Sequence, residues 1–87
     1  MSRHEVPARD AAHKVIVGWD HPLLTFFVQV IDRAREAAGD DDKFVLWRCC
    51  SVREIYEIDQ LARITDRYAV LTSGLRATLY GDKDEGR

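Results

Sequence analysis

The chain has 87 residues, the size of one folded domain, and 87 residues are too few for two separate cores. Hydrophobic residues make up 46% of it and charged residues 32%, which is the balance of an ordinary globular protein. The formal net charge is −2 with the two signs interleaved, so the basic face typical of nucleic-acid binding is missing. The longest mostly apolar run, residues 23–31, falls far short of the roughly 20 residues of a membrane helix. We therefore expect a single-domain cytoplasmic protein (1–87) whose partners are neither nucleic acid nor membrane.

The first part of the chain predicts a leader followed by a strand. Residues 1–13 show no sustained hydrophobic period, so we expect them to be flexible. Lys14–Trp19 is a β-branched run that favours a pleated surface and predicts the first strand. The turn Trp19-Asp20-His21-Pro22 ends it, because Pro22 cannot donate to a β-ladder and biases His21 towards a turn.

Leu23–Ile31 predicts the second strand, in which alternate side chains point to opposite faces. The even-numbered positions from 24 to 30 are all apolar. The odd-numbered positions are mixed, but they include Leu23, Phe27 and Ile31. This strand is therefore apolar on both faces.

The segment between the second and third strands allows two structures. Asp32 can cap a single helical turn that Gly39 ends in the left-handed conformation, and a mobile loop suits a connection of this length equally well. Phe44–Arg48 predicts the third strand. It carries Val45 and Trp47 on one face and two more hydrophobic side chains on the other.

From Ser51 to Tyr80, apolar residues recur every three or four positions, which indicates a helix with one buried stripe. A capping-box signature at Ser51 marks the start of this helix. Thr72-Ser73-Gly74 combines poor helix formers with a cap, so we expect a break there and then a short helix that ends at Gly81. The charged residues 82–87 lack apolar anchors and predict a disordered tail.

These elements predict a two-layer α+β fold, in which a three-stranded antiparallel sheet (β-β-β) is followed by a long and a short C-terminal helix. Three strands are about 14 Å across and a helix is about 10 Å wide, so the two helices cover about one face. The other face would then expose more apolar area than the few hundred Å² that a monomer usually shows. A helix on each face, or a leader folded over the second face, would remove this surface.

The uncovered face predicts a non-enzymatic protein that acts through protein–protein association, either as a homodimer or as an accessory or regulatory subunit of another protein. The expected partner-binding residues are Leu23, Phe27, Ile31, Val45 and Trp47.

The turn at Trp19, Asp20 and His21 supports an alternative function, because it brings an aromatic ring, a carboxylate and an imidazole together. Such residues suit a recognition turn. With a pocket and a third orienting group, they would suit a small ligand-binding or catalytic module. In the simpler interpretation Asp20 bonds to its own turn, His21 is exposed and Trp19 packs at the edge of the core.

Two further clusters receive no functional assignment. Asp40-Asp41-Asp42 favours a solvated turn over a metal site, because consecutive side chains in a loop diverge. Cys49 and Cys50 are adjacent, and a disulfide between neighbours is strained, so we expect free thiols in a reducing compartment. A helix start beside them would favour thiol reactivity, but burial as small hydrophobes is the interpretation we favour. We expect no catalytic, cofactor-binding or metal-binding residues.

Overall fold

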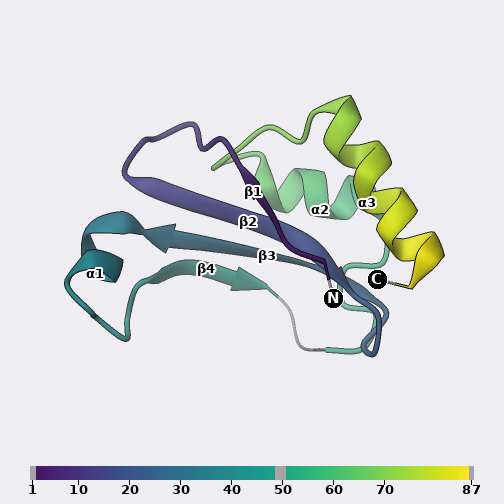
Figure 1. The fold of residues 1–87 in the computed structure, drawn as a ribbon, viewed down its shortest axis with the longest axis horizontal. Coiled ribbons are helices and arrows are strands. Elements are labelled where there is room, and N and C mark those ends of the chain that lie inside the picture. The colour runs from purple at the N-terminus through teal and green to yellow at the C-terminus, as the bar shows by residue number, and fades with distance from the viewer. Residues whose placement is uncertain (1, 49–50, 87) are drawn as a thin grey trace.

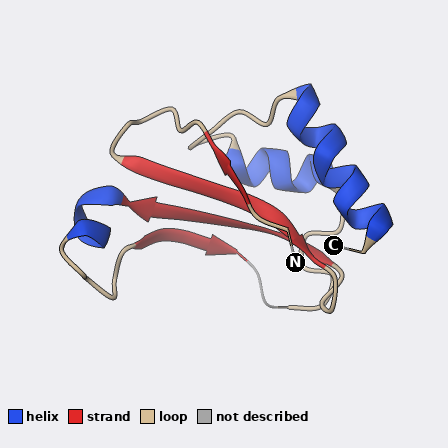
Figure 2. Ribbon diagram, in the orientation of Figure 1, coloured by secondary structure: helices blue, strands red, loops and turns tan. Residues whose placement is uncertain are grey.

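The computed structural model describes residues 2–48 and 51–86. Across these residues, four strands form one antiparallel sheet in which each strand lies beside its neighbours in sequence. Figures 1 and 2 show two helices packed together on one face of the sheet, and a third, short helix at the far end. The elements are β1 (His4–Val6), β2 (His13–Asp20), β3 (Thr25–Asp32), α1 (Arg33–Ala37), β4 (Phe44–Arg48), α2 (Ile58–Thr65) and α3 (Ser73–Glu85). The expected α+β class, with an antiparallel sheet followed by C-terminal helices, is confirmed.

The number of strands is corrected from three to four. His4–Val6 lies within the segment expected to be a flexible leader, yet it forms β1 and pairs with β2. Val6 is buried in the main core. Three residues are too few to show an alternating pattern, and Pro7 follows at once, so the strand depends on its partner rather than on local propensity.

The first C-terminal helix begins later than the sequence predicts. Residues 51–57 form turns, and α2 begins at Ile58. Its capping box is at Glu57, whose backbone N–H donates to Oε1 of Gln60 at 3.0 Å. The expected helix at Ser51 fails because Arg53 has a positive φ of 54°, and a helix cannot pass through that conformation. The sequence predicts a long helix followed by a short one, but the structure has the opposite order, with 8 residues in α2 and 13 in α3.

Ile55 explains why the apolar period before α2 is not helical. Its N–H donates to the hydroxyl oxygen of Thr25 at 2.8 Å, and its carbonyl oxygen accepts from the Phe26 N–H at 2.8 Å. The Ile55 side chain is buried. These bonds attach the turns at 51–57 to the start of β3, so Ile55 packs into the main core from a turn instead of from a helix.

Three expected caps appear in the structure. Oδ1 of Asp32 accepts from the N–H groups of Ala34 and Arg35, so the single helical turn forms as α1. Thr72 caps α3, with its hydroxyl accepting from the Leu75 N–H at 3.2 Å, but α2 already ends at Thr65, so the gap between the two helices begins before the expected break. Gly39 has a φ of 74°, in the left-handed region.

Helix α3 extends past Gly81 and ends at Gly86, where φ is 72°. Residues 82–85, within the segment expected to form a disordered tail, thus make the last turn of α3. Asp82 is buried there, with Oδ2 2.7 Å from Nε2 of His4 on β1. This anchor is polar, so a search for apolar residues misses it.

The main core lies between the sheet and helices α2 and α3. Inward-facing side chains of all four strands meet one face of each helix there. Its buried members from β2, β3 and the helices are Val15, Val17, Trp19, Phe26, Val28, Val30, Ile58, Leu61 and Leu79.

A second, smaller core lies on the opposite face. Ile16, Phe27 and Ile31 are buried there, with Phe44 packed against them. Gly18 stands opposite Phe27 across β2 and β3, and the Phe27 ring occupies the space where a side chain at Gly18 would lie. This small core is therefore closed within a single chain.

Charged side chains flank the smaller core. Glu5 and Lys14 are the cross-strand partners of Ile16 and Ile31, and they form ion pairs with Arg33 and Glu36 of α1 at 3.6 and 3.7 Å. The long aliphatic stems of such residues can cover apolar surface while their charges stay in water. Helix α1 thus contributes to shielding the face that α2 and α3 leave open.

Replacing Gly18 with alanine should lower the free energy of unfolding. The added Cβ would lie 2.7 Å from the Phe27 ring and would overlap the Ser2 carbonyl oxygen, so we expect a loss of about 1–3 kcal/mol. Gly81→Ala is the matched control, because its Cβ meets nothing within 4 Å in a helix, and we expect a gain of about 0.5–1 kcal/mol. Urea unfolding measures both. Equal stability of the two variants would contradict the packing described for Phe27.

Thr25→Val tests the attachment of Ile55 to the sheet. The substitution leaves the buried Ile55 N–H without its acceptor, so the free energy of unfolding should fall by about 1–3 kcal/mol. Thr78→Val, at an exposed site in α3, should change it little because threonine and valine have similar helix propensities. A Thr25 variant as stable as the Thr78 variant in thermal and urea melts would show that this hydrogen bond is unimportant.

Candidate functional site

The two edges of the sheet differ. Strand β1 is short, and the chain that follows it is already paired with the connection between α2 and α3. There, the Arg9 N–H donates to the Tyr68 carbonyl oxygen at 2.8 Å, and Ala8 forms an antiparallel bridge with Ala69. A short edge strand whose following residues already pair with another part of the chain offers few free backbone groups to an added strand.

Strand β4 forms the other edge, and no strand in the described part of the chain lies on its outer side. Figure 1 shows it running along the margin of the sheet farthest from α2 and α3. Val45 and Trp47 are 44% and 51% exposed, and Arg48 is exposed beside them. An edge strand of this kind presents backbone N–H and C=O groups that another chain can bind.

The pairing of β4 with β3 is interrupted by one bulge. Val30 faces Leu46 and Ile31 faces Phe44, so Val45 is the additional residue. A bulge bends and twists its strand, and it makes two residues that are three apart point to the same face. This is why both Phe44 and Trp47 lie on the face opposite the helices.

Phe44 and Trp47 form an aromatic pair on that face, with ring centroids 4.4 Å apart and planes tilted by 36°. The Lys43 ammonium lies 5.6 Å from the Phe44 ring centroid, within cation–π range. Phe44 is half-buried against the small core, whereas Trp47 is the more exposed of the two. The result is a large aromatic surface directly beside an open strand edge.

The five partner-binding residues expected from the sequence do not lie on one surface. Phe27 and Ile31 are only 3% and 4% exposed, inside the small core. Leu23 lies in the β2–β3 turn, where its carbonyl oxygen accepts from the Arg53 N–H at 3.0 Å. Val45 and Trp47, both on β4, are the two that the structure leaves accessible. The accessible part of the predicted surface is therefore β4, an edge of the sheet instead of a whole face.

The turn after β2 uses its own polar groups. Trp19 is 1% exposed, and its indole N–H donates to Nδ1 of His21 at 3.4 Å. Oδ1 of Asp20 accepts from the Leu23 N–H at 3.5 Å, a long bond that follows the turn. The His21 ring packs beside Gly86 at the end of α3. These three residues stabilise the turn and join it to α3.

Lys83 adds a contact that the sequence does not predict. Its ammonium lies 3.6 Å from the Tyr56 ring centroid and 5.6 Å from that of Trp19, and it donates to the Tyr56 carbonyl oxygen at 2.8 Å. Tyr56 and Lys83 are far apart in the sequence, and neither stands in a motif. Their cation–π contact holds the end of α3 against the turns at 51–57.

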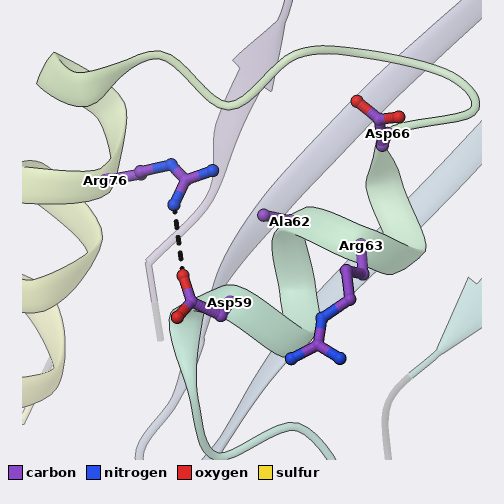
Figure 3. A pocket seen from close by; sticks show the side chains of 5 residues that line it. All are labelled: Asp59, Ala62, Arg63, Asp66 and Arg76. Carbon is purple, nitrogen blue, oxygen red and sulfur yellow. Dashed lines mark hydrogen bonds and ion pairs between the residues drawn. The ribbon is translucent and has the colours of Figure 1, made fainter.

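A hollow of about 450 Å³ lies between α2 and α3. It is lined by Asp59, Ala62, Arg63, Asp66 and Arg76. Figure 3 shows Arg76 of α3 reaching towards Asp59 of α2, with Nη1 3.3 Å from Oδ1.

The lining of this hollow carries two positive and two negative side chains, and Asp66 is paired with Arg9 at 2.9 Å. The charges therefore balance locally and select neither an anion nor a cation. None of the lining residues belongs to the turn at residues 19–22, so the hollow is not the pocket that a site at this turn would need.

The remaining sequence clusters give no site. Oδ1 of Asp40 accepts from the Asp42 N–H at 2.9 Å, the bond of a local turn in which all three carboxylates are exposed. Among the residues that the structure describes, no group of three or more His, Cys, Asp or Glu side chains is placed to hold a metal ion. Cys49 and Cys50 lie outside the described residues.

Comparison of the chain with protein-family models, with curated proteins and with solved structures finds no match. No helix in the described ranges is both long enough and apolar enough to cross a membrane.

The two tryptophans give a direct optical test of the β4 surface. In protein dilute enough to be monomeric, acrylamide should quench the fluorescence of exposed Trp47 strongly and that of buried Trp19 weakly, so wild-type protein should show two components. Trp47→Phe should remove the readily quenched component and leave the protected one. Strong quenching that persists in the Trp47→Phe protein would contradict the burial of Trp19, and loss of the protected component instead would contradict the exposure of Trp47.

Proposed function

We propose that this protein acts without catalysis, by associating with another protein chain that adds a strand to the outer edge of β4. One observation carries the proposal: β4 is an open edge with Val45 and Trp47 exposed on it, whereas the β1 edge is short and its continuation is paired. Added strands gain affinity from backbone hydrogen bonds and specificity from alternate side chains.

Trp47 supplies the side-chain part of the proposed interface. Tryptophan is enriched among the residues that dominate binding energy, because it buries a large area at low cost in conformational entropy. Its contact with Phe44 fixes the indole beside the strand edge before a partner arrives. Such preorganisation reduces the free-energy cost of binding.

A cytoplasmic location and partners other than nucleic acid are parts of the same proposal. The net charge of −2 supports the second point, since nucleic-acid binding relies on a basic surface. The adjacent cysteines support the first, because two neighbouring thiols are poorly placed to form a structural disulfide. We do not extend the proposal to a ligand site at Trp19–His21, because the polar atoms of that turn already bond within the chain.

Site-specific crosslinking tests the proposed surface. We expect Val45→p-benzoylphenylalanine, irradiated in an extract of cells that express the protein, to give one discrete adduct with a polypeptide. Excess wild-type protein should change the yield of the adduct: it should compete away an adduct with a different polypeptide and increase an adduct with a second copy of the chain. Excess Trp47→Lys protein should do neither, because a lysine cannot supply the aromatic contact. Mass spectrometry of the adduct identifies the partner.

Tyr80 provides the matched control position, because it is 46% exposed on α3. The same photoreactive residue at position 80 should give no adduct whose yield changes when excess wild-type protein is added. The proposal is wrong if position 45 yields no adduct, or if positions 45 and 80 yield the same adduct with the same efficiency.

A further inference from the structure

We infer that the chain that pairs with β4 is a second copy of the same protein, aligned antiparallel across a two-fold axis that lies between the two copies of β4. This inference rests on the proposed function and specifies its partner. It follows from how charges are distributed along the segment that contains β4.

The two ends of this segment carry opposite charges. Asp40, Asp41 and Asp42 are exposed immediately before β4. Arg48 is the last residue of the strand, and Arg53 lies in the turns that follow. In an antiparallel pair, the N-terminal end of one β4 meets the C-terminal end of the other. The carboxylates of each copy therefore face the guanidinium groups of the other copy, once at each end of the pair. A parallel pair would place like charges together, which is destabilising.

Each end of the segment also has neighbours of the opposite charge, but these neighbours do not cancel the difference in charge between the two ends. At the acidic end, Lys43 is the basic neighbour, and its ammonium lies over the Phe44 ring. Arg35 donates to the Asp42 carbonyl oxygen at 3.1 Å, which leaves the Asp42 carboxylate free of that bond. Three carboxylates therefore outweigh the Lys43 ammonium and the Arg35 guanidinium at the start of β4, and Arg35 is also paired with Asp32 at 3.8 Å.

At the basic end, Nε of Arg48 is 3.7 Å from Oε2 of Glu54, a long ion pair in which the Arg48 side chain remains 48% exposed. Arg53 lies over the Tyr56 ring, with its guanidinium carbon 5.5 Å from the ring centroid. Glu54 is only 27% exposed, so breaking its ion pair with Arg48 would leave a largely buried carboxylate without its partner. A guanidinium has further N–H groups besides Nε–H, so Arg48 can bind a carboxylate of a second copy while it keeps its contact with Glu54.

The centre of the same segment is apolar. A two-fold axis places the same patch on both copies, so Val45 and Trp47 of one chain would meet Val45 and Trp47 of the other. Apolar residues at the centre with charged groups at the rim are the usual arrangement of a protein interface. The segment is thus self-complementary in charge and in hydrophobicity.

A charge-swap pair tests this arrangement by sedimentation velocity and equilibrium on the purified full-length chain. Wild-type protein should form dimers. Asp41→Lys/Asp42→Lys and Arg48→Asp should each weaken self-association at least about tenfold, because each creates two clusters of like charge in a homodimer. An equimolar mixture of the two variants should recover the dimer, since the introduced lysines then face the introduced aspartate. High salt should weaken the wild-type dimer through screening.

Asp84→Lys is the control for a change in net charge, because Asp84 is exposed on α3, and we expect it to leave the dimer unchanged. Circular dichroism confirms that each variant is folded. If either variant does not fold, two other measurements test the inference: the effect of salt on the wild-type dimer, and the self-association of Trp47→Lys protein. Dimers that neither salt nor Trp47→Lys weakens would overturn the inference.

Other outcomes separate this inference from the proposed function. A monomeric wild-type protein whose position 45 still crosslinks to a different polypeptide overturns the second copy as partner and leaves association through β4 in place. A wild-type dimer that is not restored by mixing the charge-swap variants overturns the antiparallel alignment. A monomer without any adduct at position 45 overturns both.

Discussion

The packing of α2 and α3 against a single face of the sheet determines which surfaces remain available. Both helices pack on the side of the main core, and their connection also pairs with the chain that follows β1. The far edge of the sheet, β4, receives no such cover from the described residues. One arrangement of helices thus protects one edge and leaves the other open.

That arrangement depends on how the chain returns from β4 to the helices. The backbone of Ile55 is bonded to Thr25 and Phe26 at the start of β3, which places α2 over the sheet. Lys83 and Asp82 then hold the end of α3 against Tyr56 and His4. These contacts join segments that are distant in sequence, so the helical layer is fixed by tertiary bonds at both of its ends.

The face without α2 and α3 does not remain an exposed apolar surface. Gly18 admits the Phe27 ring, and Ile16 and Ile31 lie between charged side chains that pair across the sheet and α1. A small core forms there without a second helical layer. Among the strand residues, Val45 and Trp47 are the exposed large hydrophobics, so an interface built on the sheet is best understood as an addition to a strand.

Local patterns in the sequence predict the elements that local chemistry controls. The β-branched and aromatic runs predict β2, β3 and β4 to within a few residues, and Asp32 and Thr72 mark real helix caps. The same patterns fail for elements whose conformation depends on contacts with residues that are distant in the sequence. Strand β1 forms because β2 is beside it, and the helix expected at Ser51 is prevented by Arg53.

For the candidate site, alternation along residues 44–48 correctly separates Trp47 from Leu46, and exposure of Trp47 and Val45 agrees with the expected surface. Alternation cannot show that Phe27 and Ile31 are buried, because their burial depends on Gly18 and on ion pairs made by α1. It also places Phe44 and Trp47 on opposite faces, since it cannot foresee the bulge at Val45.

Hydrogen–deuterium exchange of the wild-type chain, followed from dilute to concentrated solution, tests the central claim that β4 is the open edge through which this protein associates with a second copy. The account predicts rapid exchange, in dilute protein, of the β4 amides that point away from β3, and protection of those amides as the concentration rises. Protection of those amides that does not change with concentration, or protection that appears in α2, α3 or the β2–β3 turn instead, would contradict it.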